Sequence, residues 1–200
     1  MNNNITTIYF IRHAQSDFSV SDDRTRPLTE KGLDDRKLVT DFLWDKDVDT
    51  LISSPYKRAI DTIADFSEKK GLSIELIEDF REKKSDYNLI TANMDVTVFW
   101  QKQWADFNYK FGDGECLAEV QKRNIAAFKD VLKQYRNKTL AVGTHGMALS
   151  MIINYYDNTF GYDDFMMMVY INPWVAKMMF DYDKCVGIEK IDLFKLDGKQ

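Results

Sequence analysis

The stretch Ile8-Tyr-Phe-Ile-Arg-His-Ala-Gln-Ser-Asp-Phe-Ser19 decides the fold that we expect for this chain. It continues an apolar run that starts at Ile5 and ends abruptly at Arg12 and His13. A short apolar run that ends in charge is typical of a buried parallel strand. Ligands of open α/β sheets bind at the carboxyl ends of such strands. The stretch therefore predicts functional side chains directly after the first strand.

The second histidine of the chain occupies the same context as the first. The sequence contains two histidines, and His145 with Gly146 directly follows the apolar run from Thr139 to Thr144. This run predicts another buried strand. We therefore expect His13 and His145 to meet at one edge of the sheet.

Two further segments bring charged residues to the same edge. Segments 50–53 and 73–77 are predicted strands, and Glu82 lies just beyond the second one. Pro55 suits the first turn of a helix, where its missing N–H costs nothing. Arg58 then lies about 4–5 Å along the helix axis from Pro55, which keeps it close to the sheet edge.

Strands and helices alternate along the chain. Apolar residues recur at helical spacing after the first predicted strand and after the strands at 50–53 and 139–144. This alternation predicts an α/β fold, a three-layer α/β/α sandwich around a mostly parallel sheet. The tail segments 168–171, 176–180 and 188–193 are predicted as strands, some of them antiparallel at the sheet edge.

One segment departs from this alternation. From Lys83 to Gly114, aromatic residues lie in a polar background. We expect a helical cap insertion at about 83–114 that covers the sheet edge, within a single domain that spans residues 1–200. Packing is favoured over a substrate-binding box for its aromatic residues, which are Phe99, Trp100, Trp104, Phe107 and Tyr109.

Length and charge restrict the class of protein. A chain of 200 residues suits one domain that buries roughly 70% of its unfolded surface. The net charge of −5 argues against nucleic-acid and membrane partners but allows a small phosphorylated substrate in a local basic pocket. No signal-peptide pattern is evident, and no apolar run approaches the roughly 18 residues of a membrane span. Cys116 and Cys185 lack disulfide or metal-ligand spacing, which predicts a cytoplasmic protein with reduced thiols.

Together the strand ends predict a site with two arginines, two histidines and one carboxylate. The guanidinium forks of Arg12 and Arg58 match phosphate oxygens two at a time. An imidazole can attack phosphorus, and a carboxylate can protonate the leaving oxygen and later deprotonate water. The N-terminus of the helix after His145 adds backbone donors for an anion. The set therefore predicts phosphoryl chemistry.

The same residues resemble the motifs of the histidine phosphatase superfamily, the phosphoglycerate mutase-like family. The matching pieces occur in the family's order and are spread over most of the chain. They are Arg12 to Ser16, Pro27 to Thr29 with Gly32, Ser53 to Pro55 with Arg58 and Ala59, Phe80 to Glu82, Gly114 to Cys116, and Thr144 to Gly146.

The resemblance implies a role for each member of the site. His13 becomes the phosphohistidine and Glu82 is the proton donor, while the two arginines and the second histidine hold the phosphate. The family needs neither a metal ion nor another cofactor, so the implied activity is metal-independent hydrolysis of phosphate monoesters. The implied substrate-binding residues are Arg12, Ser19, Arg58, His145 and Gly146.

Three departures from the family pattern refine this expectation. Ala14 replaces the usual glycine after the nucleophilic histidine, a small change that we expect activity to survive. Ser19 stands where many relatives carry asparagine, and its hydroxyl has a shorter reach. The segment after Glu82 lacks the glycine-rich stretch of mutases and sugar bisphosphatases, so hydrolysis is favoured over mutase activity.

Several alternatives stay open at this point. A phosphoglycerate mutase-type transfer, or a catalytically idle module that binds a phosphate ligand or a protein, would use the same residues. Glu78 or Asp79 could be the acid instead of Glu82. Glu115 is interpreted as a carboxylate at the start of a long helix, with Arg123 as an ion-pair partner. The sequence names neither the substrate nor the oligomeric state, and a homodimer is one option.

Overall fold

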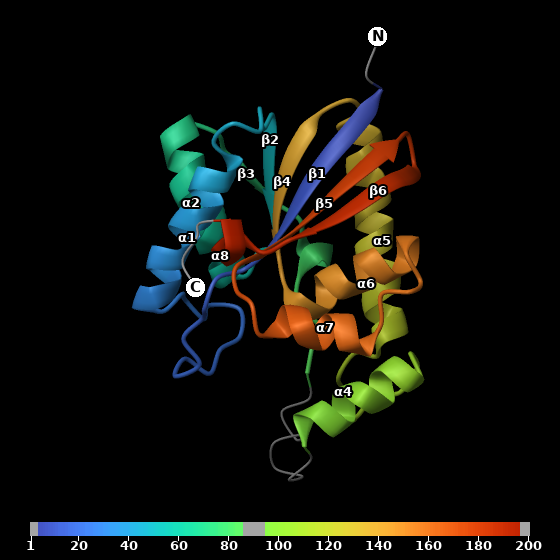
Figure 1. The fold of residues 1–200 in the computed structure, drawn as a ribbon. Coiled ribbons are helices and arrows are strands. Elements are labelled where there is room, and N and C mark those ends of the chain that lie inside the picture. The colour runs from blue at the N-terminus through green and yellow to red at the C-terminus, as the bar shows by residue number, and fades with distance from the viewer. Residues whose placement is uncertain (1–3, 86–94, 197–200) are drawn as a thin grey trace.

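A six-stranded mixed sheet forms the centre of the computed structural model, which describes residues 4–85 and 95–196 (Figure 1). In chain order its strands are β1 (Ile5–Arg12), β2 (Thr50–Ser53), β3 (Ile74–Leu76), β4 (Thr139–Thr144), β5 (Trp174–Asp181) and β6 (Lys184–Ile191). Their order across the sheet is β3-β2-β4-β1-β5-β6. The first four in this order pair parallel, whereas β5 pairs antiparallel with both β1 and β6. The predicted α/β fold with an antiparallel edge is confirmed.

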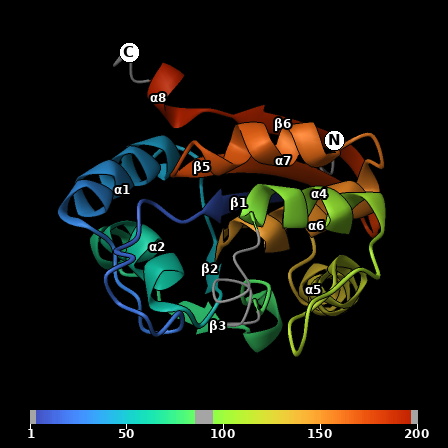
Figure 2. The same cartoon turned by 90° about the horizontal axis from the view of Figure 1, so that it is seen from below.

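Helices cover both faces of this sheet. They are α1 (Glu30–Leu43), α2 (Lys57–Lys70), α4 (Val96–Ala105), α5 (Leu117–Gln134), α6 (Gly146–Tyr156), α7 (Tyr162–Val169) and α8 (Leu193–Leu196), with a 3₁₀ turn η1 (Glu78–Phe80). Figure 2 shows α1 and α2 on one side of the sheet and α5 and α6 on the other, which gives the three predicted layers. Helices α4 and α7 lie beyond the end of the sheet at which β1 finishes (Figure 1). Among the described residues, no helix combines the length and apolar character needed to cross a membrane.

Side-chain alternation along the strands produces two cores. Ile8 and Phe10 of β1 belong to the core that includes residues of α5 and α6. Tyr9 and Ile11 belong to the opposite core, with residues of α1 and α2. Successive side chains of a strand point to opposite faces, and helices cover both faces here. This is why the first strand is a continuous apolar run rather than an alternating one.

The strand predicted at 168–171 is wrong, because this segment is the end of α7 and the turn after it. Phe165 and Met168 are both buried, whereas Met167 between them is 73% exposed. Burial at positions three apart is the spacing of a helix. Asp164 stabilises the start of this helix, because its carboxylate accepts the backbone N–H of the N-cap residue Gly161 at 3.1 Å.

The other two strands predicted in the tail are confirmed with different bounds. Segment 176–180 lies inside β5, and segment 188–193 overlaps β6. β6 ends at Ile191, where the chain turns into α8. The Asp192 side chain caps the start of this helix, because it accepts the N–H of Phe194 at 3.1 Å.

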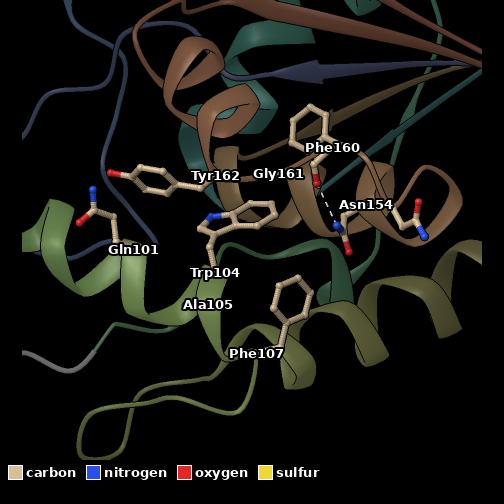
Figure 3. A pocket seen from close by; sticks show the side chains of 9 residues that line it. Gln101, Trp104, Ala105, Phe107, Asn154, Phe160, Gly161 and Tyr162 are labelled. Atoms are coloured by element: carbon tan, nitrogen blue, oxygen red, sulfur yellow. Dashed lines mark hydrogen bonds between the residues drawn. The ribbon is translucent and has the colours of Figure 1, made fainter.

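Helix α4 lies within the segment predicted as a cap, of which residues 86–94 are outside the described part. The rings of Trp100 and Trp104 pack against Phe165 of α7, with centroid separations of 5.2 Å and 6.0 Å. Trp104 also lies 6.3 Å from the ring of Phe160, and Figure 3 shows its indole between the rings of Tyr162, Phe160 and Phe107. The packing role predicted for these aromatic residues is confirmed.

Candidate active site

The ends of β1 and β4 bring the two histidines together. The two strands pair in parallel with Arg12 beside Thr144, and the N–H of His13 donates to the carbonyl of Thr144 at 3.0 Å. His145 is the N-cap residue of α6. The rings of His13 and His145 lie edge to face, with centroids 5.3 Å apart. The sequence-predicted meeting of these side chains at one sheet edge is therefore present in the structure.

Hydrogen bonds determine the tautomer of His13. Its Nδ1 lies 2.7 Å from the carbonyl oxygen of Ala14, which can only accept. Its Nε2 lies 3.1 Å from Nε of Arg58, which can only donate. Nδ1 therefore carries the hydrogen, and Nε2 presents a lone pair. Burial, with the charges of Arg58 and Arg12, holds the pKa of His13 well below its ordinary value, so the imidazole is neutral.

Arg12 connects the site to the end of α7. Its Nη1 donates to the carbonyl oxygens of Met168 and Ile171 at 2.9 Å and 2.8 Å. Its Nε is buried and has no hydrogen-bond partner among the described residues. Burial lowers the pKa of Arg12 to about 10, so the guanidinium keeps its charge at neutral pH. Arg12 thus offers one free, buried N–H donor beside His13.

Arg58 is held by the loop that follows β1. Its Nη1 lies 3.2 Å from a carboxylate oxygen of Asp23 and also donates to the Asp23 carbonyl. The same Asp23 oxygen pairs with Arg26 at 2.9 Å. Burial lowers the pKa of Arg58, against the opposing charge of Asp23. Sequence reasoning missed Asp23 and Arg26, because a polar run between strand and helix indicates only a surface loop.

His145 is the fully buried member of the site. Its Nε2 lies 2.7 Å from the hydroxyl of Ser54, and the ring of Tyr56 lies 5.2 Å away. Its Nδ1 has no hydrogen-bond partner among the described residues. Burial, with the charges of Arg58 and His13, holds the pKa of His145 well below its ordinary value. A neutral ring that accepts from Ser54 at Nε2 can donate from Nδ1.

Glu82 lies at the N-terminus of α6. Its carboxylate accepts the backbone N–H groups of Met147 and Ala148 at 3.2 Å and 3.1 Å. A Cβ built on Gly146 would lie 3.4 Å from Nε of Arg12 and 3.8 Å from a carboxylate oxygen of Glu82. The glycine therefore lies between the arginine and the carboxylate and leaves the space between them open.

The other two acidic residues considered as the acid lie elsewhere. Glu78 forms a paired hydrogen bond with Arg24 at 2.9 Å and 2.7 Å, and both side chains are exposed. Asp79 pairs with Arg81 at 3.1 Å. Of the three, Glu82 is the carboxylate that the structure brings next to Arg12 and the start of α6.

Arg123 supports the segment that carries Glu82. Its guanidinium donates to the carbonyls of Asp79, Arg81 and Glu82 at 2.7 Å, 2.9 Å and 3.1 Å. Its Nε pairs with Glu115 at 2.7 Å, so the predicted Glu115–Arg123 ion pair is present.

The interpretation of Glu115 as a helix-start residue is wrong. Helix α5 begins at Leu117 with Cys116 as its N-cap, and the N–H of Cys116 donates to Glu119 at 2.9 Å. Glu119 therefore takes the position at the helix start. Glu115 instead turns back to Arg123 and Arg81.

Ser19 and Ala14 complete the predicted set. Ser19 is exposed, and its N–H donates to the Asp17 carboxylate at 2.9 Å within the loop. None of the hydrogen bonds between described residues joins it to the histidines or arginines of the site. Ala14 is buried, and its N–H donates to Thr62 of α2 at 3.0 Å. No group of three or more His, Cys, Asp or Glu residues in the described ranges is arranged to hold a metal ion.

Comparison with known proteins agrees with this geometry. Residues 8–173 match the histidine phosphatase superfamily (branch 1). Phosphoserine phosphatase 1 of Hydrogenobacter thermophilus is 27% identical over 149 residues, which cover 69% of this chain and 70% of that protein.

Solved structures share the fold of this chain. The YhfR structure from Bacillus stearothermophilus has a TM-score of 0.75 at 23% identity and covers 90% of this chain and 94% of its own. The phosphoserine phosphatase of Entamoeba histolytica was solved in complex with 3-phosphoglyceric acid. It has a TM-score of 0.74 at 19% identity and covers 94% of this chain and 98% of its own. With both histidines, two arginines and one carboxylate at the shared sheet edge, the chain belongs to the histidine phosphatase superfamily and is a phosphatase-type hydrolase.

Proposed function

We propose that the protein hydrolyses phosphate monoesters through a phosphohistidine intermediate on His13. The observation that carries this proposal is the tautomer of His13, whose Nδ1 donates to Ala14 while Nε2 presents its lone pair. A neutral imidazole that carries a lone pair on Nε2 is the form that attacks phosphorus. The intact set around it is the reason to favour catalysis over an idle binding module.

The first step forms the phosphoenzyme. The phosphate takes hydrogen bonds from Arg58, from Nε of Arg12 and from Nδ1 of His145, and Arg58 releases Nε2 of His13. Nε2 attacks in line, the N–P bond forms, and the bond from phosphorus to the ester oxygen breaks. Glu82, protonated in this step, gives its proton to the leaving oxygen, so an alcohol departs. The buried donors stabilise charge on the transferring oxygens.

The second step hydrolyses the phosphoenzyme. Glu82, now a carboxylate, accepts a proton from water as the water oxygen attacks phosphorus. The N–P bond breaks, and its electron pair returns to Nε2 of His13. Inorganic phosphate leaves, and Glu82 is protonated again for the next cycle.

We infer that the substrates are phosphate esters of small hydroxy acids or amino acids. The names of the relatives support this substrate class, because a phosphoserine phosphatase and a structure holding 3-phosphoglyceric acid are among them. We also infer a cytoplasmic location, which is supported by two cysteines that are both free thiols.

The test is hydrolysis of p-nitrophenyl phosphate with EDTA present, for the wild type, His13→Ala and Glu82→Gln. We expect turnover by the wild type, none by His13→Ala, and reduced turnover by Glu82→Gln. An inert wild type across a panel of natural phosphate esters, but with thermal stabilisation by phosphate, would instead indicate a binding module. With 3-phosphoglycerate we expect free phosphate, and formation of an isomeric phosphoglycerate would indicate a mutase.

A further inference from the structure

Lys83 directly follows Glu82, and its side chain is buried next to α4. The residue is 5% exposed, and its Nζ lies 5.3 Å from the ring centroid of Phe99. In the proposed mechanism Glu82 protonates the leaving oxygen, so the leaving group lies on the Glu82 side of the phosphate. The backbone N–H of Lys83 donates to the Glu82 carboxylate at 2.7 Å, so the residue lies beside the group that protonates the leaving oxygen. In the proposed mechanism this is the side of the substrate that differs from one phosphate ester to another.

The ammonium group of Lys83 has no counter-ion among the described residues. Residues 4–85 and 95–196 place no carboxylate in an ion pair with it. The carboxylate of Glu82 is held by backbone N–H groups at the start of α6, and Glu115 is held by Arg123 and Arg81. An unpaired buried charge is unfavourable. An anion that reached this position would supply the missing partner.

The electrostatic surroundings of Lys83 agree with this assignment. Burial lowers the pKa of Lys83, and the charges of Glu82 and then Glu115 act to raise it. A bound anion would act in the same direction as these carboxylates and favour the ammonium form.

We propose that Lys83 binds a carboxylate on the leaving group, so that the site prefers phosphate esters that carry one. A carboxylate fits better than a second phosphate, because a single ammonium is a compact point charge, whereas paired phosphate oxygens suit the forks of arginine. This inference rests on the proposed function and assigns a specificity-determining residue to it.

The test uses O-phosphoserine and O-phosphoethanolamine, which differ by the carboxylate. We expect the wild type to prefer phosphoserine in kcat/KM by about 10- to 100-fold, the range for one hydrogen bond to a charged group. Lys83→Met should bring this preference close to one, chiefly through KM. Lys84→Met is the matched control and should keep the wild-type preference, because the Lys84 side chain is exposed.

Three results would overturn the inference. The first is a wild type that hydrolyses the two esters equally well, a measurement that needs no variant. The second is a preference that survives Lys83→Met, or Lys83→Gln if the first variant does not fold by circular dichroism. The third is an equal loss on both esters with a shifted pH profile, which would make Lys83 a positioning residue for Glu82. Failure of the proposed function looks different, because then the wild type would hydrolyse neither ester.

Discussion

Nε of Arg58 donates to Nε2 of His13 at 3.1 Å, so the arginine covers the lone pair that attacks phosphorus in the proposed mechanism. The other side of the Arg58 guanidinium is bound to Asp23. A phosphate that enters the site must therefore draw Arg58 away from the histidine. In the proposed mechanism, Arg58 thus becomes free to bind phosphate and His13 to attack it in the same event.

This relationship predicts that Arg58→Lys is not a conservative change. Lysine keeps the charge but loses the planar fork and its Nε donor. We expect kcat/KM for p-nitrophenyl phosphate to fall by about 10²- to 10³-fold, the usual loss for one preorganised donor. Arg136→Lys, at an exposed position beside Tyr182, is the control and should keep wild-type kinetics. A loss of less than about threefold in Arg58→Lys would argue against its role at the phosphate.

The role that we propose for Glu82 predicts a dependence on the leaving group. An alkyl phosphate needs a proton on its leaving oxygen, whereas p-nitrophenolate departs more easily without one. We therefore expect Glu82→Gln to reduce kcat/KM more for phosphoserine than for p-nitrophenyl phosphate. Glu78→Gln should leave both values near wild type, because that carboxylate is exposed and pairs with Arg24. The opposite pattern in the two variants would make Glu78 the acid.

The buried histidines predict a stability that depends on pH. Burial, with the nearby arginines, holds the pKa of both His13 and His145 well below the ordinary 6.5. Below that value the unfolded chain binds two protons that the folded chain does not. The free energy of unfolding should then fall as the pH drops, by about 1.4 kcal/mol per pH unit for each histidine.

Nuclear magnetic resonance checks this directly, because the chain has two imidazoles to follow. We expect both ring signals to stay at their neutral positions from about pH 8 to about pH 6. A midpoint at or above the ordinary value for either ring would show that the folded state holds a protonated histidine.

The contacts of Arg123 predict that its removal lowers both the stability of the protein and its activity. Removing the Arg123 side chain leaves Glu115 with Arg81 as its remaining partner and deprives three backbone carbonyls of their donor, at a cost of about 1–3 kcal/mol. Arg123→Ala should lower the free energy of unfolding by this amount and also lower kcat, since the carbonyls of Asp79, Arg81 and Glu82 lose their donor. Urea unfolding measures the first effect. Lys133→Ala, in an exposed pair with Asp130, is the control and should change stability by less than about 1 kcal/mol.

The strand ends could be predicted from the sequence because two local signals coincide there. Each of β1 and β4 is an apolar run followed directly by a histidine, and buried parallel strands have this pattern. The run from Phe165 to Ile171 has no such boundary. A short apolar run is compatible with either a buried strand or a helix. Here the hydrogen bond from Gly161 to the Asp164 carboxylate starts a helix.

The rest of the site depends on contacts between distant segments. Asp23 reaches Arg58 from a polar loop, and Glu115 folds back to Arg123 instead of starting α5. Arg12 meets the carbonyls of Met168 and Ile171 more than 150 positions away. Neither spacing nor composition reports such contacts, because they exist only once the layers pack.

The most direct measurement is capture of the phosphoenzyme. The wild type and Glu82→Gln are mixed with radiolabelled phosphate ester, quenched in alkali, which preserves phosphohistidine, and digested for peptide mapping. We expect the label on the peptide that contains His13, more of it in Glu82→Gln, and none in His13→Ala. Continued turnover with the label on another residue, or with no label at all, would contradict a phosphohistidine on His13.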